Sequence, residues 1–370
     1  MSPNRNHCGR RHGPNSLLLV AWPVVFSLLG GGLAHGNLVI HATFDSTITS
    51  DPNAAIIEGT INSVIALYEA SFSDPVTVTI TFHETSGALG ESSAYYVPGV
   101  SYSTYRAKLA AGATTANDTN ALAHLPVGSS NPVNGNATLA LNLPNGRALG
   151  FSGAEWNPPA GQSDGDIYLR TASMNLTRTS IDPSKFDLFA VTAHEIDEVL
   201  GLSSVLDGLA NGAPAPTGDV NVMDLFRYDQ NGNRSFNTTS SSQAWFSLDG
   251  TTQLVRFNQN ANGDFHDWYS PGGQTPRVQD AFGTAGATPN PTVELIALDV
   301  IGYHPVPVLA IGRAGKGQET ISWSPNPAGF VLQESTNLLS TSWLNSASGT
   351  NNPATIANTT RMKFFRVFHP

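Results

Sequence analysis

One stretch constrains the fold of this chain most, because it combines a helical apolar repeat with charged residues. Residues Phe186 to Leu202 read F-D-L-F-A-V-T-A-H-E-I-D-E-V-L-G-L. Apolar side chains recur at spacings of three and four, which predicts a helix with one buried stripe. Pro183 is typical of a helix start and Gly201 of a helix stop. The residues of the predicted stripe are Phe186, Phe189, Ala193, Ile196 and Leu200.

Another face of this helix carries His194 and Glu198, which stand one turn apart, with Glu195 beside them. Two donors on adjacent turns can reach one metal ion, and an intervening glutamate can take a proton from water. Glu198 can be a ligand because zinc accepts carboxylate oxygen, and an oxygen-rich set also admits manganese, magnesium or calcium. A solvated acidic face is the alternative. The apolar surroundings weigh against it, because unpaired charges there cost free energy.

The helix also resembles a known metal-binding helix. The segment A-H-E-I-D-E-V-L-G-L (193–202) is similar to the A-H-E-I-x-H-x-L-G-x helix of secreted bacterial metzincin-like metalloproteases, and it departs from that pattern at Glu198. Later blocks resemble an exported bacterial metalloprotease family whose members include H-E-I-x-E-V-L-G forms. These blocks are M-D-L-F-R-Y (223–228), W-F-S-L-D-G (245–250), G-D-F-H-D-W (263–268) and A-L-D-V-I-G-Y (297–303). The resemblance implies a zincin-like metallopeptidase domain over residues 37–304.

The resemblance also implies roles for the residues of the helix. His194 and Glu198 would hold zinc, or another divalent metal. Glu195 would be the catalytic general base for the water that attacks a peptide bond.

Further ligands must come from beyond the helix. The family's spacing points to Ser204, which is a poor zinc ligand. We therefore expect His266 as the next metal ligand and Asp207 after it. Asp219 and Asp224 are further carboxylates in this region.

A substrate-binding strand is expected just before the metal helix. In zincins this strand is a sheet edge that pairs with the backbone of an extended peptide. The segment D-G-D-I-Y-L-R (164–170) reads as a turn followed by a short strand. The resemblance thus places the substrate-binding residues at Ile167, Tyr168 and Leu169. An edge strand without a substrate role stays open as an alternative.

Residues 1–36 have the pattern of a signal peptide. Arginines precede an apolar run from Leu17 to Leu33, and Ala34 and Gly36 suit a signal peptidase. A membrane anchor is the alternative, but Pro23 and several glycines interrupt the run. We therefore expect cleavage, a secreted or cell-surface protein, and no stable membrane insertion. Cys8 is the only cysteine, so the mature chain would have neither disulfides nor cysteine catalysis.

Charge narrows the class of partner. The chain has a formal net charge of −10 and no basic cluster, which argues against nucleic acid and anionic membranes. Only 12% of the residues are charged, and Gly and Pro are abundant, which is typical of a secreted β-rich protein with polar loops. We expect a monomer with a polypeptide substrate.

The first half of the chain has the pattern of an α+β domain. Strands are predicted over residues 37–44, 76–82 and 138–143, and helices after Pro52 and over 101–111. Residues 229–233 resemble the start of a calcium loop but lack its bidentate glutamate, so a hairpin turn is favoured over structural calcium. The apolar face of the first helix would be Ile57, Ile61, Val64, Ile65 and Tyr68.

A linker over residues 305–307 leads to a C-terminal module over 308–370. Short alternating strands separated by turn clusters predict a small all-β sandwich. The module resembles a C-terminal β module of exported bacterial proteins, which implies attachment or spacing. Its predicted core is Trp323, Phe330, Leu332, Trp343, Phe364 and Phe365.

The sequence therefore predicts a secreted metal-dependent endopeptidase. The alternative is a catalytically inactive, zincin-derived binding or adhesion protein, favoured by the loss of the second histidine. A metal hydrolase that acts on substrates other than peptides is a third candidate.

Overall fold

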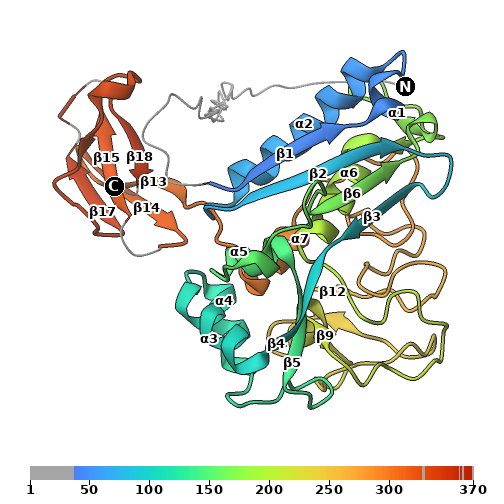
Figure 1. Cartoon of the computed structure of the whole chain (residues 1–370). Helices are drawn as coiled ribbons and strands as arrows, with labels where there is room; N and C mark the ends of the chain where they lie inside the picture. Colours follow the sequence, from blue (N-terminus) through green and yellow to red (C-terminus); the bar gives the residue numbers. More distant parts are fainter. Residues whose placement is uncertain (1–36, 327–329, 358, 361, 369–370) are drawn as a thin grey trace, which may run out of the picture.

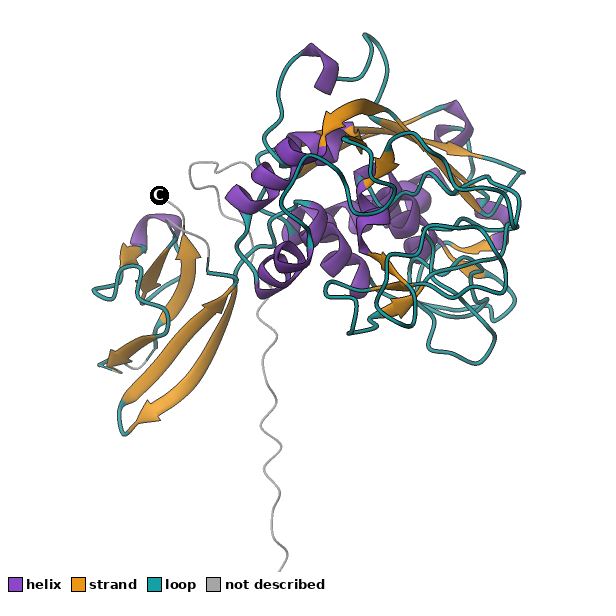
Figure 2. Cartoon of the chain, turned by 90° about the horizontal axis from the view of Figure 1, so that it is seen from below, coloured by secondary structure: helices purple, strands orange, loops and turns teal. Residues whose placement is uncertain are grey.

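The structure is a computed structural model that describes residues 37–370 except 327–329, 358, 361 and 369–370. The predicted signal peptide, residues 1–36, lies outside the described residues. Helices and strands are interspersed and the strands belong to several small sheets, so the α+β expectation is confirmed at this level. Figure 2 shows the C-terminal strands standing apart from the helices of the preceding part.

Among the described residues, the main sheet has four strands in the order β1-β2-β6-β3. Strands β1 (Val39–Phe44), β2 (Thr77–Glu84) and β6 (Gly165–Leu169) are parallel, and β3 (Gly90–Ala94) lies antiparallel beside β6 (Figure 1). The strict alternation of β2 buries every second side chain, as predicted from the sequence.

The position of β6 corrects a prediction. Because β6 has hydrogen-bonded neighbours on both sides, Ile167, Tyr168 and Leu169 are interior to the sheet and do not form its edge. The edge strand on this side of the sheet is β3, a serine-rich segment without the apolar alternation that marks a strand in the sequence.

Two helices lie against this sheet. Helix α2 (Ala54–Ser71) follows β1 and buries its whole predicted face, and it packs on α6 (Leu188–Leu200), which also contacts β3 and β6. The Tyr68 hydroxyl of α2 donates a hydrogen bond of 3.0 Å to the carbonyl of Ala193. This bond fixes α6 at the turn that carries the predicted metal ligands.

Helix α6 ends as predicted but begins later. Gly201 has a φ of 132° and stops the helix. The start at Pro183 is wrong, because the residues before α6 pair as β8 (Phe186–Asp187) with β7 (Met174–Asn175), and Asp187 caps the helix. The buried surface is also wider than one stripe, since most of the helix lies inside the protein.

The remaining elements of this part are short. The helices are α1 (Ser46–Thr49), α3 (Tyr102–Gly112), α4 (Ala116–His124), α5 (Leu143–Ala148) and α7 (Val293–Ile301), with 3₁₀ turns at η1 (Ala154–Trp156), η2 (Thr171–Ser173) and η3 (Val222–Phe226). The strands are β4 (Tyr96–Ser101), β5 (Thr138–Asn142), β9 (Val220–Asn221), β10 (Arg227–Tyr228), β11 (Trp245–Phe246) and β12 (Val255–Arg256). Residues 201–292, between α6 and α7, are therefore mostly loop.

The segment 229–233 is a turn, as the sequence favoured. Asp229 accepts hydrogen bonds from the backbone N–H groups of Asn231 and Asn233, and Tyr228 bridges to Arg234 across the turn. The carboxylate oxygen that a calcium loop would direct at an ion is used by the turn itself.

The C-terminal module has two small sheets with a core of their own. One contains β13 (Val308–Gly315), β14 (Gln318–Ser324) and β17 (Ala354–Ala357), and the other β15 (Val331–Ser335), β16 (Leu344–Asn345) and β18 (Phe364–Phe368), with η4 at Ser340–Ser342. Its buried cluster is Ile321, Trp323, Leu332 and Ala354.

The predicted core of the module is only partly correct. Trp323 and Leu332 are buried, but the remaining predicted side chains are half-buried, because two three-stranded sheets cannot cover them. Part of the predicted linker, residues 305–307, is hydrogen-bonded to the preceding domain. Pro305 pairs with Phe72, and the Val306 N–H bonds to the Ser71 carbonyl, so its first residues are tied to the end of α2.

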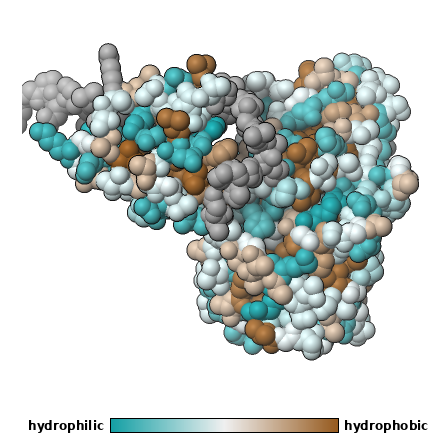
Figure 3. Space-filling model, turned by 60° about the vertical axis from the view of Figure 1, so that its left-hand side comes forward, coloured by the Kyte–Doolittle hydropathy of each residue, from teal (hydrophilic) through white to brown (hydrophobic). Residues whose placement is uncertain are grey.

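No helix in the described part of the chain has both the length and the apolar character that crossing a membrane requires. On the face drawn in Figure 3, hydrophobic residues occur as separate spots among polar ones.

Candidate metal centre

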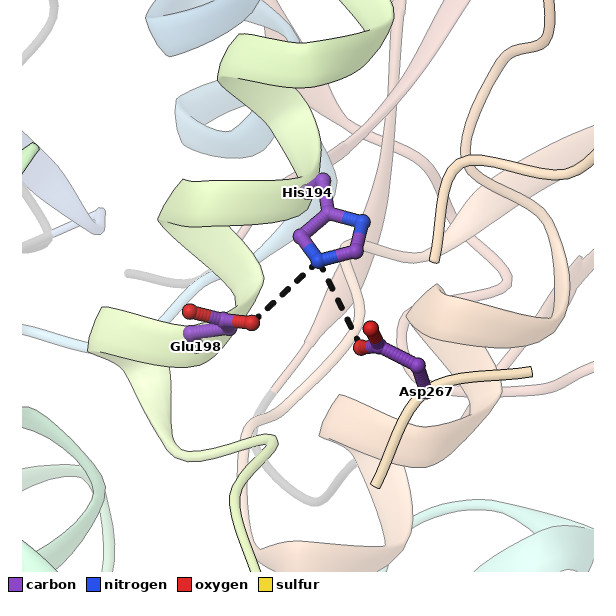
Figure 4. A group of neighbouring side chains, drawn as sticks. All are labelled: His194, Glu198 and Asp267. Carbon is purple, nitrogen blue, oxygen red and sulfur yellow. Dashed lines mark ion pairs between the residues drawn. The ribbon is translucent and has the colours of Figure 1, made fainter. Parts of the chain in front are cut away.

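Helix α6 directs His194 and Glu198 toward the same point, as their spacing predicted. Nε2 of His194 lies 3.2 Å from Oε1 of Glu198 and 3.4 Å from Oδ1 of Asp267, which comes from the long loop region (Figure 4). The side chains of His194 and Glu198 are 15% and 12% exposed. Three donors from two distant segments therefore meet at a site that solvent can still reach.

The structure also brings His266 to this point. Its Nε2 lies 2.8 Å from Oε1 of Glu198 and 3.3 Å from Oδ1 of Asp267. The position of His266 agrees with the expectation that it stands near the helix pair. Asp267 is an additional donor that the sequence analysis named only as part of its D-F-H-D-W block.

Neighbouring donor atoms in the cluster are spaced as one small ion would require. The contacts between imidazole nitrogens and carboxylate oxygens run from 2.8 to 3.4 Å. An ion held tetrahedrally by bonds of about 2.0 to 2.1 Å separates neighbouring donors by about 3.3 Å. The donor atoms of His194, Glu198 and Asp267 all lie within 4.8 Å of one another. These three residues therefore fit a divalent ion in size and in chemistry, and His266 lies beside two of them.

Asp207 occupies a different position from the one predicted. Its Oδ2 lies 2.6 Å from Nδ1 of His266, and its Oδ1 accepts from the backbone N–H groups of Phe265 and His266. Asp207 thus stands behind His266 and fixes the orientation of the imidazole, leaving Nε2 to face the cluster. Asp207 therefore lies behind His266 and not among the donor atoms that face one another.

The other candidates beyond the helix have structural partners. The Ser204 hydroxyl donates to Asp224 at 2.5 Å, and Asp224 caps η3. Asp219 accepts from the Gly99 N–H and from the Thr138 hydroxyl.

Groups around the cluster hold its ligands in place. Nδ1 of His194 lies 3.0 Å from the carbonyl of Val278, so it carries the proton and Nε2 is free to bind. The Ser92 hydroxyl donates to Oε2 of Glu198 at 2.5 Å, and the Gln279 amide donates to Oδ1 of Asp267 at 2.9 Å.

The charges of the cluster are strongly coupled. Burial raises the pKa of Glu198, but the imidazoles beside it outweigh burial and lower it below its ordinary value. Burial lowers the pKa of His194 and His266, yet the surrounding carboxylates raise both well above the ordinary value. Burial raises the pKa of Asp267 to about 7. Protons and a metal ion therefore compete for the same donor atoms.

Glu195 lies under the edge strand. It is 4% exposed, and a Cβ added to Gly90 of β3 would stand 2.1 Å from its Oε1. Burial first, and the charge of Glu198 second, raise the pKa of Glu195 well above its ordinary value. A residue other than glycine at this position of β3 would displace the carboxyl group from its observed place.

A cleft of about 400 Å³ opens over these residues. His194, Glu195, Glu198 and Asp267 line it together with residues 88–92, which lead into and form the first part of β3. A second cavity of about 620 Å³ continues past Glu198 along the rest of β3. The edge strand therefore borders the site over its whole length.

The predicted substrate residues lie away from this cleft. Ile167 and Leu169 are fully buried, and Tyr168 stacks on His83 with ring centroids 4.5 Å apart. Gly90 and Ser92, which the sequence analysis did not select, take the edge position instead. Asp267 could have been selected from its place beside His266 in the D-F-H-D-W block.

Comparisons with protein-family models, with curated proteins and with solved structures found no match to this chain.

Proposed function

We propose that the chain is a metal-dependent peptidase, with zinc as the ion and with His194, Glu198, His266 and Asp267 as the residues that hold it. The observation that carries this proposal is the convergence of their donor atoms beside a buried glutamate in an open cleft. A bound divalent ion would polarise the scissile carbonyl and make a water molecule more acidic.

The residues of the chain supply the rest of the chemistry. Glu195 neighbours His194 on the helix and lines the same cleft, so it is placed to accept the proton of the attacking water. The same carboxyl group can then pass the proton to the departing amine.

An extended peptide is the substrate class that the cleft fits best. The outer edge of β3 borders both cavities, and an exposed edge can hydrogen-bond to the backbone of a peptide by strand addition. This gives β3 the role that the sequence analysis assigned to β6. The pattern of residues 1–36 supports a secreted protein.

A structural metal site in a binding protein is the second candidate. The number of protein donors favours it, since structural zinc sites have four and catalytic ones three. The cleft over the donor cluster favours the peptidase instead, because structural zinc sites are closed to solvent and this one is open.

The two candidates are separated by two measurements on the purified chain 37–370. Both candidates predict stoichiometric zinc in a measurement of metal content. Only the peptidase predicts hydrolysis of casein. Glu195→Gln should keep the zinc and abolish hydrolysis, because the amide cannot accept the proton. Zinc with no casein hydrolysis would favour the structural site, and hydrolysis of simple esters alone would indicate another class of hydrolase.

A further inference from the structure

We propose that Gln279 is a positioning residue that holds Asp267 and His194 in the geometry the metal needs, with Glu294 as its anchor. This inference rests on the proposed function, because it assigns the support of the same site. None of the sequence patterns selected either residue.

The side chain of Gln279 acts on Asp267. Its Nε2 donates a hydrogen bond of 2.9 Å to Oδ1 of Asp267, which is the oxygen that faces both histidines. Gln279 is fully buried, and its Oε1 has no hydrogen-bond partner among the described residues. The amide therefore has a single polar contact, and that contact sets which way the Asp267 oxygen points.

The backbone of the same segment acts on His194. The carbonyl of Val278, the preceding residue, accepts the bond from Nδ1 of His194 at 3.0 Å. The Gln279 carbonyl accepts from the N–H of Trp268 at 2.7 Å, directly after Asp267. One short segment thus contacts a ligand on helix α6 and a ligand on the loop.

Glu294, in the first turn of α7, ties this segment to the protein core. Its Oε1 accepts from the Trp268 indole at 2.9 Å and from the Gln279 N–H at 3.1 Å, and its Oε2 accepts from the Thr292 N–H. Glu294 is fully buried, so these bonds have no competition from water. A buried carboxylate on a helix therefore fixes a loop that has no regular structure of its own.

Such support is needed because the ligands come from separate parts of the chain. His194 lies on a helix, whereas Asp267 lies on a loop whose backbone could otherwise shift. Partners that orient metal ligands commonly change metal affinity by about 10- to 100-fold when they are lost.

The test is Gln279→Met in the chain 37–370, which removes the amide donor and keeps a side chain of similar length. Zinc affinity is measured by competition with a chromophoric chelator, and the stability of the metal-free protein by thermal unfolding. We expect zinc affinity to fall by about 10- to 100-fold. The visible spectrum of the cobalt(II) form should change as well, because it reports the coordination geometry.

The matched control is Gln333→Met in the C-terminal module. Gln333 is also buried and bonds to Asn345 and Arg366, so the control loses the same kind of contact away from the site. It should leave zinc affinity and the cobalt spectrum unchanged. A role for Gln279 in folding alone would lower the unfolding temperature of its variant without altering either readout.

A second substitution tests the same contact if the Gln279→Met variant does not fold. Gln279→Leu also removes the amide donor and adds neither a charge nor a possible ligand, so it should weaken zinc binding to a similar extent. The inference is overturned when a folded Gln279 variant binds zinc as wild type does. Wild-type protein that takes up no zinc overturns the proposed function, and the inference with it.

Discussion

Gly90 offers a direct test of the position of Glu195. The substitution Gly90→Ala adds a single methyl group to the edge strand β3, where the new Cβ would lie 2.1 Å from Oε1 of Glu195 and 2.7 Å from Cγ1 of Val191. The change leaves every proposed metal ligand and the proposed base intact. It should therefore separate the placement of the carboxyl group from its chemistry.

The magnitude follows from the size of the clash. Real Cβ contacts are almost never shorter than 3.0 Å, so Oε1 of Glu195 has to move from 2.1 Å by at least about 0.9 Å. A displacement of about 1 Å at a reacting group can reduce the rate about 100-fold, which corresponds to about 2.7 kcal/mol. Because the clashing atoms belong to side chains and not to the backbone, the fold can adjust at a cost of about 1 to 3 kcal/mol.

The assay is kcat/KM for a peptide substrate, with zinc content and thermal unfolding measured on the same samples. Gly59→Ala is the matched control, since Gly59 lies on the exposed side of α2 and an added Cβ meets nothing within 4 Å. That control should keep full activity and gain about 0.5 to 1 kcal/mol of stability.

Two outcomes would refute this explanation. Gly90→Ala with wild-type kcat/KM would show that Glu195 does not act from its position under β3. Gly90→Ala that loses zinc together with activity would show that Gly90 acts through the metal ligands and not through the position of Glu195.

Three further predictions concern single side chains. Asp207→Asn should weaken zinc binding by about 10- to 100-fold in chelator competition, because it disturbs the partner of His266. Burial raises the pKa of Asp299 to about 7, so its carboxyl group binds a proton more tightly in the folded than in the unfolded state. The stability that this protonated carboxyl contributes is therefore lost as pH rises from about 4 to 7. Urea unfolding of Asp299→Asn should show a weaker pH dependence over that range. Arg227→Met should lower the free energy of unfolding by about 3 kcal/mol in urea, because Arg227 is buried and its loss leaves the carbonyls of Phe265 and Asn258 unpaired.

Local patterns predicted the regular elements well. The apolar face of α2 and the alternation of β2 each needed only neighbouring residues, and both are observed. The start of α6 was wrong because Pro183 gave a local signal, whereas pairing of β8 with β7 decided where the helix begins. The predicted edge strand at residues 167–169 was wrong because β3, the observed edge, has little apolar character. Only the sheet order identifies β3 as the edge.

The sequence by itself determined the part of the site that one helix carries. His194, Glu195 and Glu198 share a helix, so the helical repeat alone places them together. Only the tertiary structure decided which loop residues join them. Asp267, the orienting role of Asp207 and the support from Gln279 depend on the folding of residues 201–292 against the helix. No periodicity encodes such contacts, because they join positions far apart in the chain and are fixed by buried hydrogen bonds rather than by local geometry.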